Sequence, residues 1–410
     1  MHTLSMPARS PTLAILAAAP HRLLFLAGAF NVLAAMSWWT LWILAMRWQL
    51  VALPTTTLPA GWAHAFIMAF QVFTPFIFGF ALTVFPRWMG QPELGRWHYL
   101  PVGLGLLGGQ LLVLVGLWGF DHLVHLGVVF TVVGWASGLC SLGGVLWRDG
   151  FRLWHGLSVF FALAFGWFAL LMFAVWLHLP EEATLVFAAF KIAPFAFLLP
   201  VYLSVVHRML PFFANSVVPG YVMWRPQWVL PLMWALLLAH VVLELMHGYA
   251  WLWLADLPLL ALGITMVWKM WPRGPMPGLL RVLFIALAWF PVAMALFVGQ
   301  SLWFAWSGEF ALGRGPMHAL AIGFFGSMLV AMVTRVTQGH SGRLLVMPLV
   351  GWIAFWGVQL AALTRLAAEL RPDYWAWQAI AGGLWLAAFL PWALRSAWIY
   401  LTPRADRRPG

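Results

Sequence analysis

Long apolar runs, each long enough to form a membrane-spanning helix, follow one another along almost the whole chain. Charged residues or clusters of proline and glycine separate each run from the next. A helix needs about 20 apolar residues to cross the hydrocarbon core of a bilayer, so each run predicts one crossing. The runs lie at 22–46, 62–86, 98–119, 122–147, 154–178, 183–207, 227–247, 250–271, 280–306, 315–338, 346–367 and 374–400.

The runs lack the alternation of polar and apolar residues that marks the strands of a membrane barrel, so only helices fit them. We therefore predict an all-α polytopic integral membrane protein of about twelve transmembrane helices. No soluble domain interrupts the series, and the predicted organisation is a single transmembrane domain over 22–401. A cytoplasmic N-terminal tail, 1–21, precedes this domain, and a cytoplasmic C-terminal tail, 402–410, follows it.

The amino-acid composition agrees with this interpretation and restricts the partners. Hydrophobic residues make up 64% of the chain and charged residues 8%, whereas soluble domains carry about 25% charged residues. The net charge of +11 is spread in ones and twos along the chain. No cluster of lysine and arginine is long enough to grip a phosphate backbone. We expect the chain to associate with a lipid bilayer and not with nucleic acid.

The arginine and lysine residues predict the orientation of the helices. Seventeen of the 22 fall in the N-terminal tail, in alternate loops and in the C-terminal tail. Because basic residues are retained on the cytoplasmic side of a membrane, this bias predicts that both termini are cytoplasmic. The basic residues of the opposite, outer side are Arg47, Arg314, Arg365 and Arg371.

Thirteen histidines are an excess in a chain with so few charged residues. Imidazole is the usual protein ligand of haem iron and also suits copper. His64 opens the second predicted helix and His318 opens the tenth, both from the outer side. Their matching depth predicts that the two imidazoles ligate one haem in the outer half of the membrane. The alternative is that each histidine makes only local hydrogen bonds at the interface.

The seventh predicted helix supplies two further candidate metal ligands. His240 and His247 are seven residues apart, or two helical turns, so we expect them to share a face. Glu244 of the same helix and Lys191 of the sixth helix are ionisable groups inside spans, where a buried charge is costly. We expect either an ion pair between them or a lysine that reaches the interface. The histidines that we interpret as ordinary interfacial residues are His98, His122, His125, His155 and His178.

Histidine and arginine also gather at the predicted cytoplasmic ends of the sixth and tenth helices. We predict that they form one inner site, which holds haem propionates, a second haem or copper. The alternative is that these residues cap the helices and set the topology. The residues of this predicted inner site are His207, Arg208, Arg335, His340 and Arg343.

A weak internal repeat links the second, sixth and tenth predicted helices. The second and tenth both begin with His-Ala and carry a threonine and an arginine near their ends, and the sixth ends with His207-Arg208. The three helices are four apart in the series. This spacing favours an arrangement in three four-helix units.

Three stretches of the sequence resemble signatures of the NnrS family. The most specific is the tenth-helix run, with Met-His-Ala-Leu at 317–320, Met-Val-Thr-Arg-Val at 332–336 and Gly-His-Ser-Gly-Arg at 339–343. Gly-Phe at 79–80 with Trp-Met-Gly at 88–90, and Arg-Met-Leu-Pro-Phe-Phe at 208–213, also resemble this family. The resemblance implies a bacterial inner-membrane protein that carries haem, of the b type, and copper. It further implies a part in the response to nitric oxide and in defence against nitrosative stress.

The sequence departs from the family pattern at the start of the second helix. The family commonly has Trp-His-Ala-His-Glu-Met there, and this chain has Phe66 and Ile67 in place of the second histidine and the glutamate. His207 stands where the family pattern leads us to expect glycine. It is therefore a candidate for a compensating ligand.

Two other functions remain open from the sequence. Twelve spans are common among membrane transporters, and Lys191 and Glu244 would then belong to a substrate path. The second alternative is a redox enzyme acting on nitric oxide, by analogy with the heme-copper oxidases. Those enzymes also have twelve helices in three arcs, with haem between helices 2 and 10 and copper on helices 6 and 7.

Overall fold

The computed structural model describes residues 12–54 and 56–406, and in this part of the chain it contains helices and no strands. Parts of the predicted tails, 1–11 and 407–410, therefore lie outside the described residues. The α-helices are α1 (Thr12–Leu16), α2 (Pro20–Trp48), α3 (Ala60–Ile67), α4 (Thr74–Trp88), α5 (Leu100–Gly116), α6 (Asp121–Asp149), α7 (Trp154–Trp176), α8 (Ala183–Ile192), α9 (Leu199–Val217), α10 (Val229–Leu245), α11 (Trp253–Met270), α12 (Gly278–Ser307), α13 (Gly315–His318), α14 (Ser327–His340), α15 (Leu349–Ala368) and α16 (Tyr374–Leu401). Two short 3-10 helices are η2 (Arg96–His98) and η4 (Tyr249–Trp251), and three π-helical segments are η1 (Met68–Val72), η3 (Ala193–Leu198) and η5 (Ala319–Gly326).

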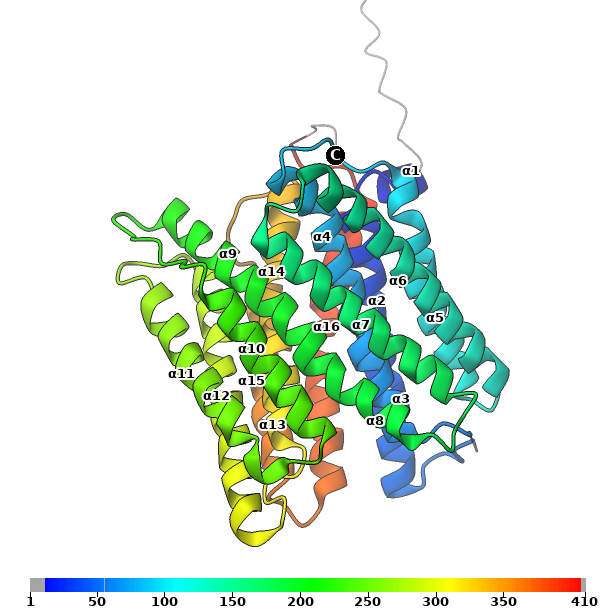
Figure 1. Ribbon diagram of the computed structural model, residues 1–410. Coiled ribbons are helices and arrows are strands. Elements are labelled where there is room, and N and C mark those ends of the chain that lie inside the picture. Colours follow the sequence, from blue (N-terminus) through cyan, green and yellow to red (C-terminus); the bar gives the residue numbers. More distant parts are fainter. Residues whose placement is uncertain (1–11, 55, 407–410) are drawn as a thin grey trace, which may run out of the picture.

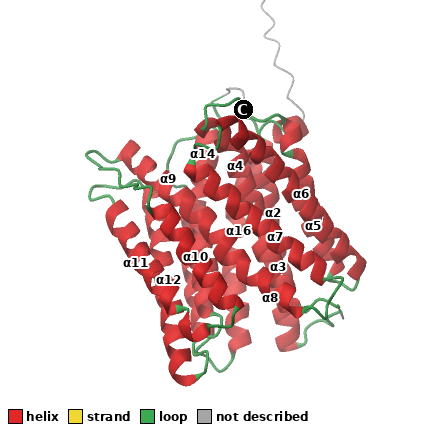
Figure 2. Cartoon of the chain, in the orientation of Figure 1, coloured by secondary structure: helices red, strands yellow, loops and turns green. Residues whose placement is uncertain are grey.

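These elements confirm a polytopic helical membrane protein. Eleven helices among the described residues are long and apolar enough to cross a membrane, and Val229–Leu245 is a shorter apolar helix in the position of the seventh predicted span. Together they correspond one to one with the twelve predicted runs. Figure 2 shows the helices running roughly alongside one another, with the loops gathered toward the two ends of the bundle.

Two boundaries differ from the prediction in ways that matter for the site. The first long helix begins at Pro20, so His21 and Arg22 lie buried in α2 and not at the edge of a tail. Proline suits this position because the first turn of a helix leaves its backbone N–H groups unpaired anyway. The sixth span continues to Val217, ten residues past the predicted end at 207, with Pro211 inside the helix.

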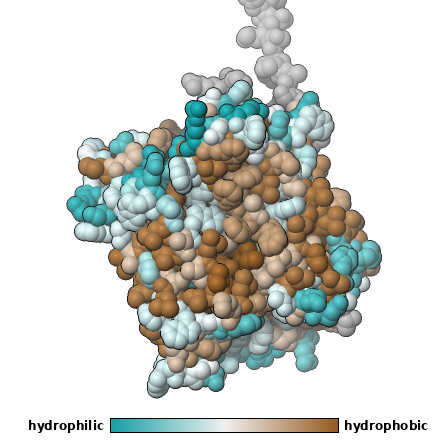
Figure 3. Space-filling model, viewed as in Figure 1, coloured by the Kyte–Doolittle hydropathy of each residue, from teal (hydrophilic) through white to brown (hydrophobic). Residues whose placement is uncertain are grey.

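The surface of the bundle has the pattern expected of a protein surrounded by lipid. On the face shown in Figure 3, hydrophobic side chains cover the middle of the molecule and hydrophilic ones gather toward its two ends. Large apolar side chains such as Leu104, Trp268 and Leu363 are more than half exposed on the helices. Water would penalise such exposure, whereas hydrocarbon does not.

Three helices occupy the centre of the bundle, and we call them the central helices: α3–η1–α4, α8–η3–α9 and α13–η5–α14. Their apolar windows are 83%, 72% and 83% buried, whereas the windows of the other candidate spans are at most 61% buried. The remaining helices surround them, and the ring closes where α2 packs against α16. Figure 1 shows α1 and the C-terminal end of the chain at the same end of the bundle.

Each central helix contains one of the three π-helical segments. Such segments are rare, and they often occur where a helix carries a functional side chain. The central helices are the second, sixth and tenth spans, which is the spacing of the weak sequence repeat. The arrangement thus agrees with three four-helix units, each of which contributes one interrupted helix to the core.

The contact between α5 and α6 depends on glycine. A Cβ atom on Gly105 of α5 would lie 2.5 Å from the Cα atom of Gly134 in α6. Without side chains at these positions the two backbones approach closely, which is a common way for helices to associate in a membrane.

Candidate functional site

The predicted outer pair, His64 and His318, lies next to two of the π-helical segments. His64 is in α3, four residues before η1 begins, and His318 is the last residue of α13, directly before η5. The two histidines are near enough to influence each other electrostatically. Both histidine residues are partly buried and keep some solvent-accessible surface. The fold therefore brings together two side chains that are 254 positions apart in the sequence.

The two imidazoles of the outer pair are oriented by different contacts. His318 donates its Nδ1 proton to the backbone carbonyl oxygen of Arg314, at 2.9 Å. This bond leaves the Nε2 lone pair of His318 free, which is the usual arrangement of a metal-ligating histidine. His64 stacks on Trp39 of α2, with ring centroids 4.3 Å apart and planes 14° apart.

Two arginines complete the surroundings of the outer pair, and the sequence analysis used them only for topology. Arg314 and Arg365 both act electrostatically on His64 and on His318. Arg365 is buried and donates hydrogen bonds to Glu369 Oε1 at 2.7 Å and to the Tyr374 hydroxyl at 3.0 Å. The outer pair thus lies in a positively charged environment that is suited to anionic groups.

The predicted inner site contains two separate histidine pairs instead of one cluster. His207 of α9 shares a hydrogen bond of 3.0 Å with His155 of α7, between His207 Nδ1 and His155 Nε2. His340 of α14 packs against His21 of α2, with ring centroids 4.5 Å apart. Neither His155 nor His21 was predicted as a partner, because His21 falls in the predicted tail and His155 was interpreted as an ordinary interfacial residue.

The arginines of the predicted inner site pack over aromatic rings from different helices. Arg208 lies 4.5 Å from the ring centroid of Trp88, Arg335 lies 3.8 Å from that of Phe213, and Arg343 lies 5.3 Å from that of Trp398. Such cation–π contacts stabilise a guanidinium at the membrane interface without an acidic partner. Of the three, Arg343 lies in a loop outside the spans, and burial lowers the pKa of its guanidinium.

The two histidines of the seventh span do not share a helix face. Helix α10 ends at Leu245, and His247 lies in the following turn with a positive φ of 54°. Its imidazole Nδ1 is 3.1 Å from the Tyr249 hydroxyl. His240 is fully buried instead, and its Nδ1 is hydrogen-bonded to Asp256 of α11 at 2.6 Å. Neither histidine belongs to a group of three or more potential metal ligands among the described residues, so the structure does not support the predicted metal site on this helix.

A buried ionic cluster extends from His240 across three helices. The predicted ion pair between Lys191 and Glu244 is formed, and Glu244 Oε1 lies 4.0 Å from His240 Nε2. Asp256, which the sequence analysis did not single out, closes the other side of the imidazole. An isolated carboxylate in an apolar run is a signal that could have identified it, because ionisable residues within spans are rare.

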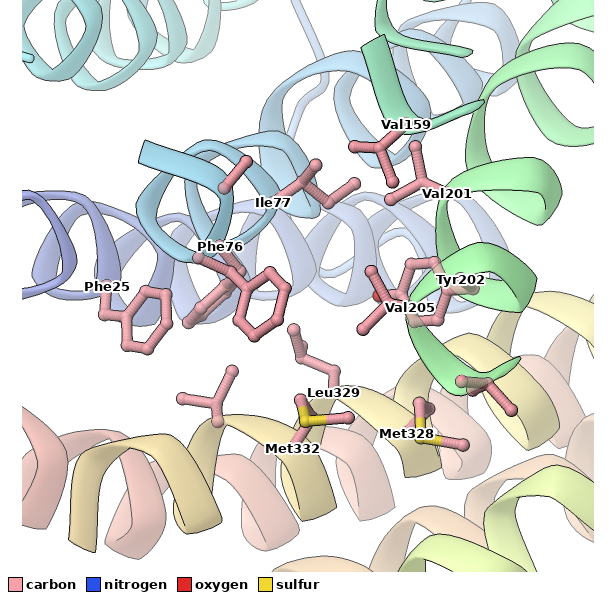
Figure 4. Close-up of a pocket in the computed structure, with 14 residues that line it drawn as sticks. Phe25, Phe76, Ile77, Val159, Val201, Tyr202, Val205, Met328, Leu329 and Met332 are labelled. Atoms are coloured by element: carbon pink, nitrogen blue, oxygen red, sulfur yellow. The ribbon is translucent and has the colours of Figure 1, made fainter. Parts of the chain in front are cut away.

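A small apolar cavity of about 60 Å³ lies between the three central helices. Figure 4 shows that its walls come from several helices, with Phe76 and Ile77, Val201 and Tyr202, and Met328 around it. The inner histidine pairs lie close to it along the chain. His155 is one helical turn from the cavity residue Val159, and His207 directly follows Val206, which also lines the cavity.

Within the described residues, no group of three or more histidine, cysteine, aspartate or glutamate side chains is arranged to hold a metal ion. The histidines instead form pairs, including His125 of α6 with His178 after α7, whose ring centroids are 4.7 Å apart. Each pair offers at most two imidazole ligands. Such an arrangement fits an ion that takes its remaining ligands from elsewhere, as haem iron does from its porphyrin.

The fold and these residues define a class: a polytopic helical membrane protein with paired histidines on and around its central helices. The family model described as NnrS protein matches residues 15–404, nearly the whole chain. The protein therefore belongs to the NnrS family. No curated protein sequence matches the chain significantly.

Proposed function

We propose that this protein binds haem through His64 and His318 and acts in the response to nitric oxide and in nitrosative stress defence. Membership of the NnrS family supports a function of this type. The observation that carries the proposal is the fixed orientation of His318, whose Nδ1–H is bonded to the Arg314 carbonyl. A second imidazole, on a different central helix, lies within electrostatic range of it.

The residues around the outer pair fit a haem in three respects. His64 and His318 are two neutral imidazoles that would hold the iron of a b-type haem. The guanidinium group of Arg314 can hold a propionate, whereas Arg365 is already paired with Glu369. Trp39 stacks on His64 and holds its imidazole ring in place. If bound, the haem would supply a redox-active iron, and the chain would supply its ligands, its orientation and the exclusion of water.

The apolar cavity between the central helices supports nitric oxide as the small molecule. Apolar cavities of this kind stay dry and accept small uncharged guests. A volume of about 60 Å³ is enough for a diatomic gas. In this proposal, nitric oxide dissolves in the membrane and reaches the metal from the protein interior.

We assign copper, which the family resemblance implies, to the His21–His340 pair. Both residues lie in spans at the predicted cytoplasmic side, and His21 Nδ1 is buried without a hydrogen-bond partner. Imidazole nitrogen suits copper. The copper content of a His340→Ala protein tests this assignment, and a copper content equal to that of the wild type would contradict it.

The orientation of the protein is also part of the proposal. We propose a bacterial inner-membrane location with both termini in the cytoplasm, as the distribution of basic residues predicts. Both inner histidine pairs then lie in the cytoplasmic half of the membrane, and the outer pair lies in the opposite half.

An absorption spectrum of the detergent-purified protein, with haem content measured after extraction, tests the main proposal. We expect a Soret band, one extractable b-type haem for the outer pair and a spectral change on addition of nitric oxide. A purified, folded protein without haem, obtained from cells supplied with a haem precursor, would contradict the proposal. That result would favour the transporter alternative.

A further inference from the structure

The ionic cluster on the eighth, tenth and eleventh α-helices is not used by the proposed haem function. Its members are Lys191, His240, Glu244 and Asp256. His240 and Asp256 are completely buried, and Glu244 is 6% exposed. His240 is held in place by Phe195, on which its ring stacks at 3.6 Å between centroids.

The charges of this cluster do not balance when His240 is neutral. When both carboxyls are ionised, Asp256 and Glu244 supply two negative charges and Lys191 supplies one positive charge, which leaves an excess of one negative charge. A buried, uncompensated charge inside a membrane costs several kcal/mol in general. One additional proton would neutralise the cluster. This proton can bind at the Nε2 atom of His240, which has no hydrogen-bond partner and lies 4.0 Å from Glu244 Oε1.

We infer that this cluster is a proton-binding site, in which Nε2 of His240 takes up one proton between the carboxylates of Asp256 and Glu244. The imidazole keeps its Nδ1–H bond to Asp256 throughout. Uptake forms an N–H bond at Nε2 and breaks an O–H bond of a hydronium ion at the surface, because the Glu244 carboxylate first takes the proton from that ion and then passes it to His240. The result is an imidazolium between two carboxylates, next to the Lys191 ammonium. This inference does not depend on whether haem is bound.

A chain of polar groups connects the site with the outer end of the bundle. Lys191 is partly exposed and lies 5.8 Å from the ring centroid of Tyr249, whose hydroxyl is hydrogen-bonded to the exposed His247. Glu244 therefore lies between the buried His240 and the groups that reach the surface, which are Lys191 and His247. Protons can enter from that surface and stop at His240.

The elements packed around His240 determine what else can affect its charge. Among the described residues, α8 contributes Lys191, α11 contributes Asp256, and the turn and η4 after α10 contribute His247 and Tyr249. Segment η3 and helix α12 contribute only aromatic rings, Phe195 and Phe297. The two carboxylates and Lys191 thus control the site.

The charge count gives opposite predictions for two neighbouring substitutions. Glu244→Gln removes the excess negative charge, so at a given pH the doubly protonated fraction of His240 should fall. Lys191→Met increases the excess to two negative charges, so that fraction should rise. A neighbouring charge changes such an equilibrium by about tenfold or more. The double variant restores the original excess and should return the fraction toward that of the wild type.

Solid-state NMR of the ¹⁵N-histidine-labelled protein in lipid vesicles measures these fractions, and His240→Asn assigns the signal. Lys269→Met, which removes a lysine at the opposite end of α11, is the matched control and should leave the signal unchanged. The expected result is an imidazolium signal in the wild type that weakens in Glu244→Gln and strengthens in Lys191→Met. A His240 signal that stays neutral from pH 5 to 9, or responds equally to both substitutions, would overturn the inference. If one of the single variants does not fold, the double variant is measured in its place, because its excess negative charge equals that of the wild type.

Discussion

His155 Nε2 and His207 Nδ1 lie 3.0 Å apart and join α7 to the sixth span near the central cavity. One imidazole must donate a proton to the other, so each uses one ring nitrogen in this bond. His207 therefore has a structural partner that the sequence did not reveal. A metal ion that bound His207 through Nδ1 would have to break the hydrogen bond to His155.

The first prediction concerns this pair. Loss of either imidazole should break the same hydrogen bond, so His155→Ala and His207→Ala should be non-additive, with a coupling of about 1 kcal/mol. A double-mutant cycle of unfolding in detergent measures this coupling. His207→Ala combined with His340→Ala is the control, and these two changes should be additive because His340 packs against His21 instead. Strong coupling between His207 and His340 would support the single inner site predicted from the sequence.

The second prediction concerns the contact between α5 and α6. Gly105→Ala places a methyl group 2.5 Å from the Cα atom of Gly134 and should destabilise the fold by about 1–3 kcal/mol through overpacking. Gly144→Ala on the same pair of helices is the control, because nothing lies within 4 Å of its added Cβ. It should be neutral or stabilising by up to about 1 kcal/mol, since alanine favours helix. Unfolding midpoints compare the two variants, and equal effects would contradict this packing.

The third prediction is a pH dependence at the outer end of the bundle. The hydrogen bond from Arg47 and the backbone N–H of Ala376 lower the pKa of Asp373 below its ordinary value. A lowered pKa in the folded state stabilises the protein above the ordinary value, about 4, and this stabilisation is lost as the pH falls through the lowered one. Wild type should therefore be more stable than Asp373→Asn at neutral pH, and the two should converge in acid. Thermal unfolding across that range measures the difference, and a constant difference would contradict the assignment.

The fourth prediction concerns the orientation in the membrane. In a Cys140→Ser background, cysteine at Glu93 or Leu344 should resist a membrane-impermeant thiol reagent in intact cells and react after lysis. Cysteine at Glu181 or Glu309 should react in intact cells. Glu93 and Leu344 both lie in exposed loops, so a lack of labelling there would not result from burial. The reverse pattern would invert the topology.

The sequence predicted the helices well because their signal is local. Apolar runs and basic loops determine each crossing independently of the others. The sixth span was predicted to end at 207 and instead continues to Val217, with Pro211 inside the helix. The packing of neighbouring helices around the sixth span, which the sequence does not show, accommodates this proline.

The sites were harder to predict because they depend on tertiary contacts. His64 and His318 lie near enough to interact electrostatically, because both open central helices from the same end of the bundle. The partners of His207 and His340 come from helices whose neighbours only the fold determines. Periodicity predicted that His247 would share a face with His240, but the helix ends two residues before it.

The central claim is that His64 and His318 are the two ligands of one haem, and the low-spin spectrum of single variants tests it most directly. His64→Ala and His318→Ala should each lose the reduced low-spin absorption bands and hold less haem while still inserting in the membrane. His122→Ala, which removes an exposed histidine at the same end of the bundle, should keep the wild-type spectrum. If both single variants retain a wild-type reduced spectrum and haem content, His64 and His318 are not the ligands and the account is wrong.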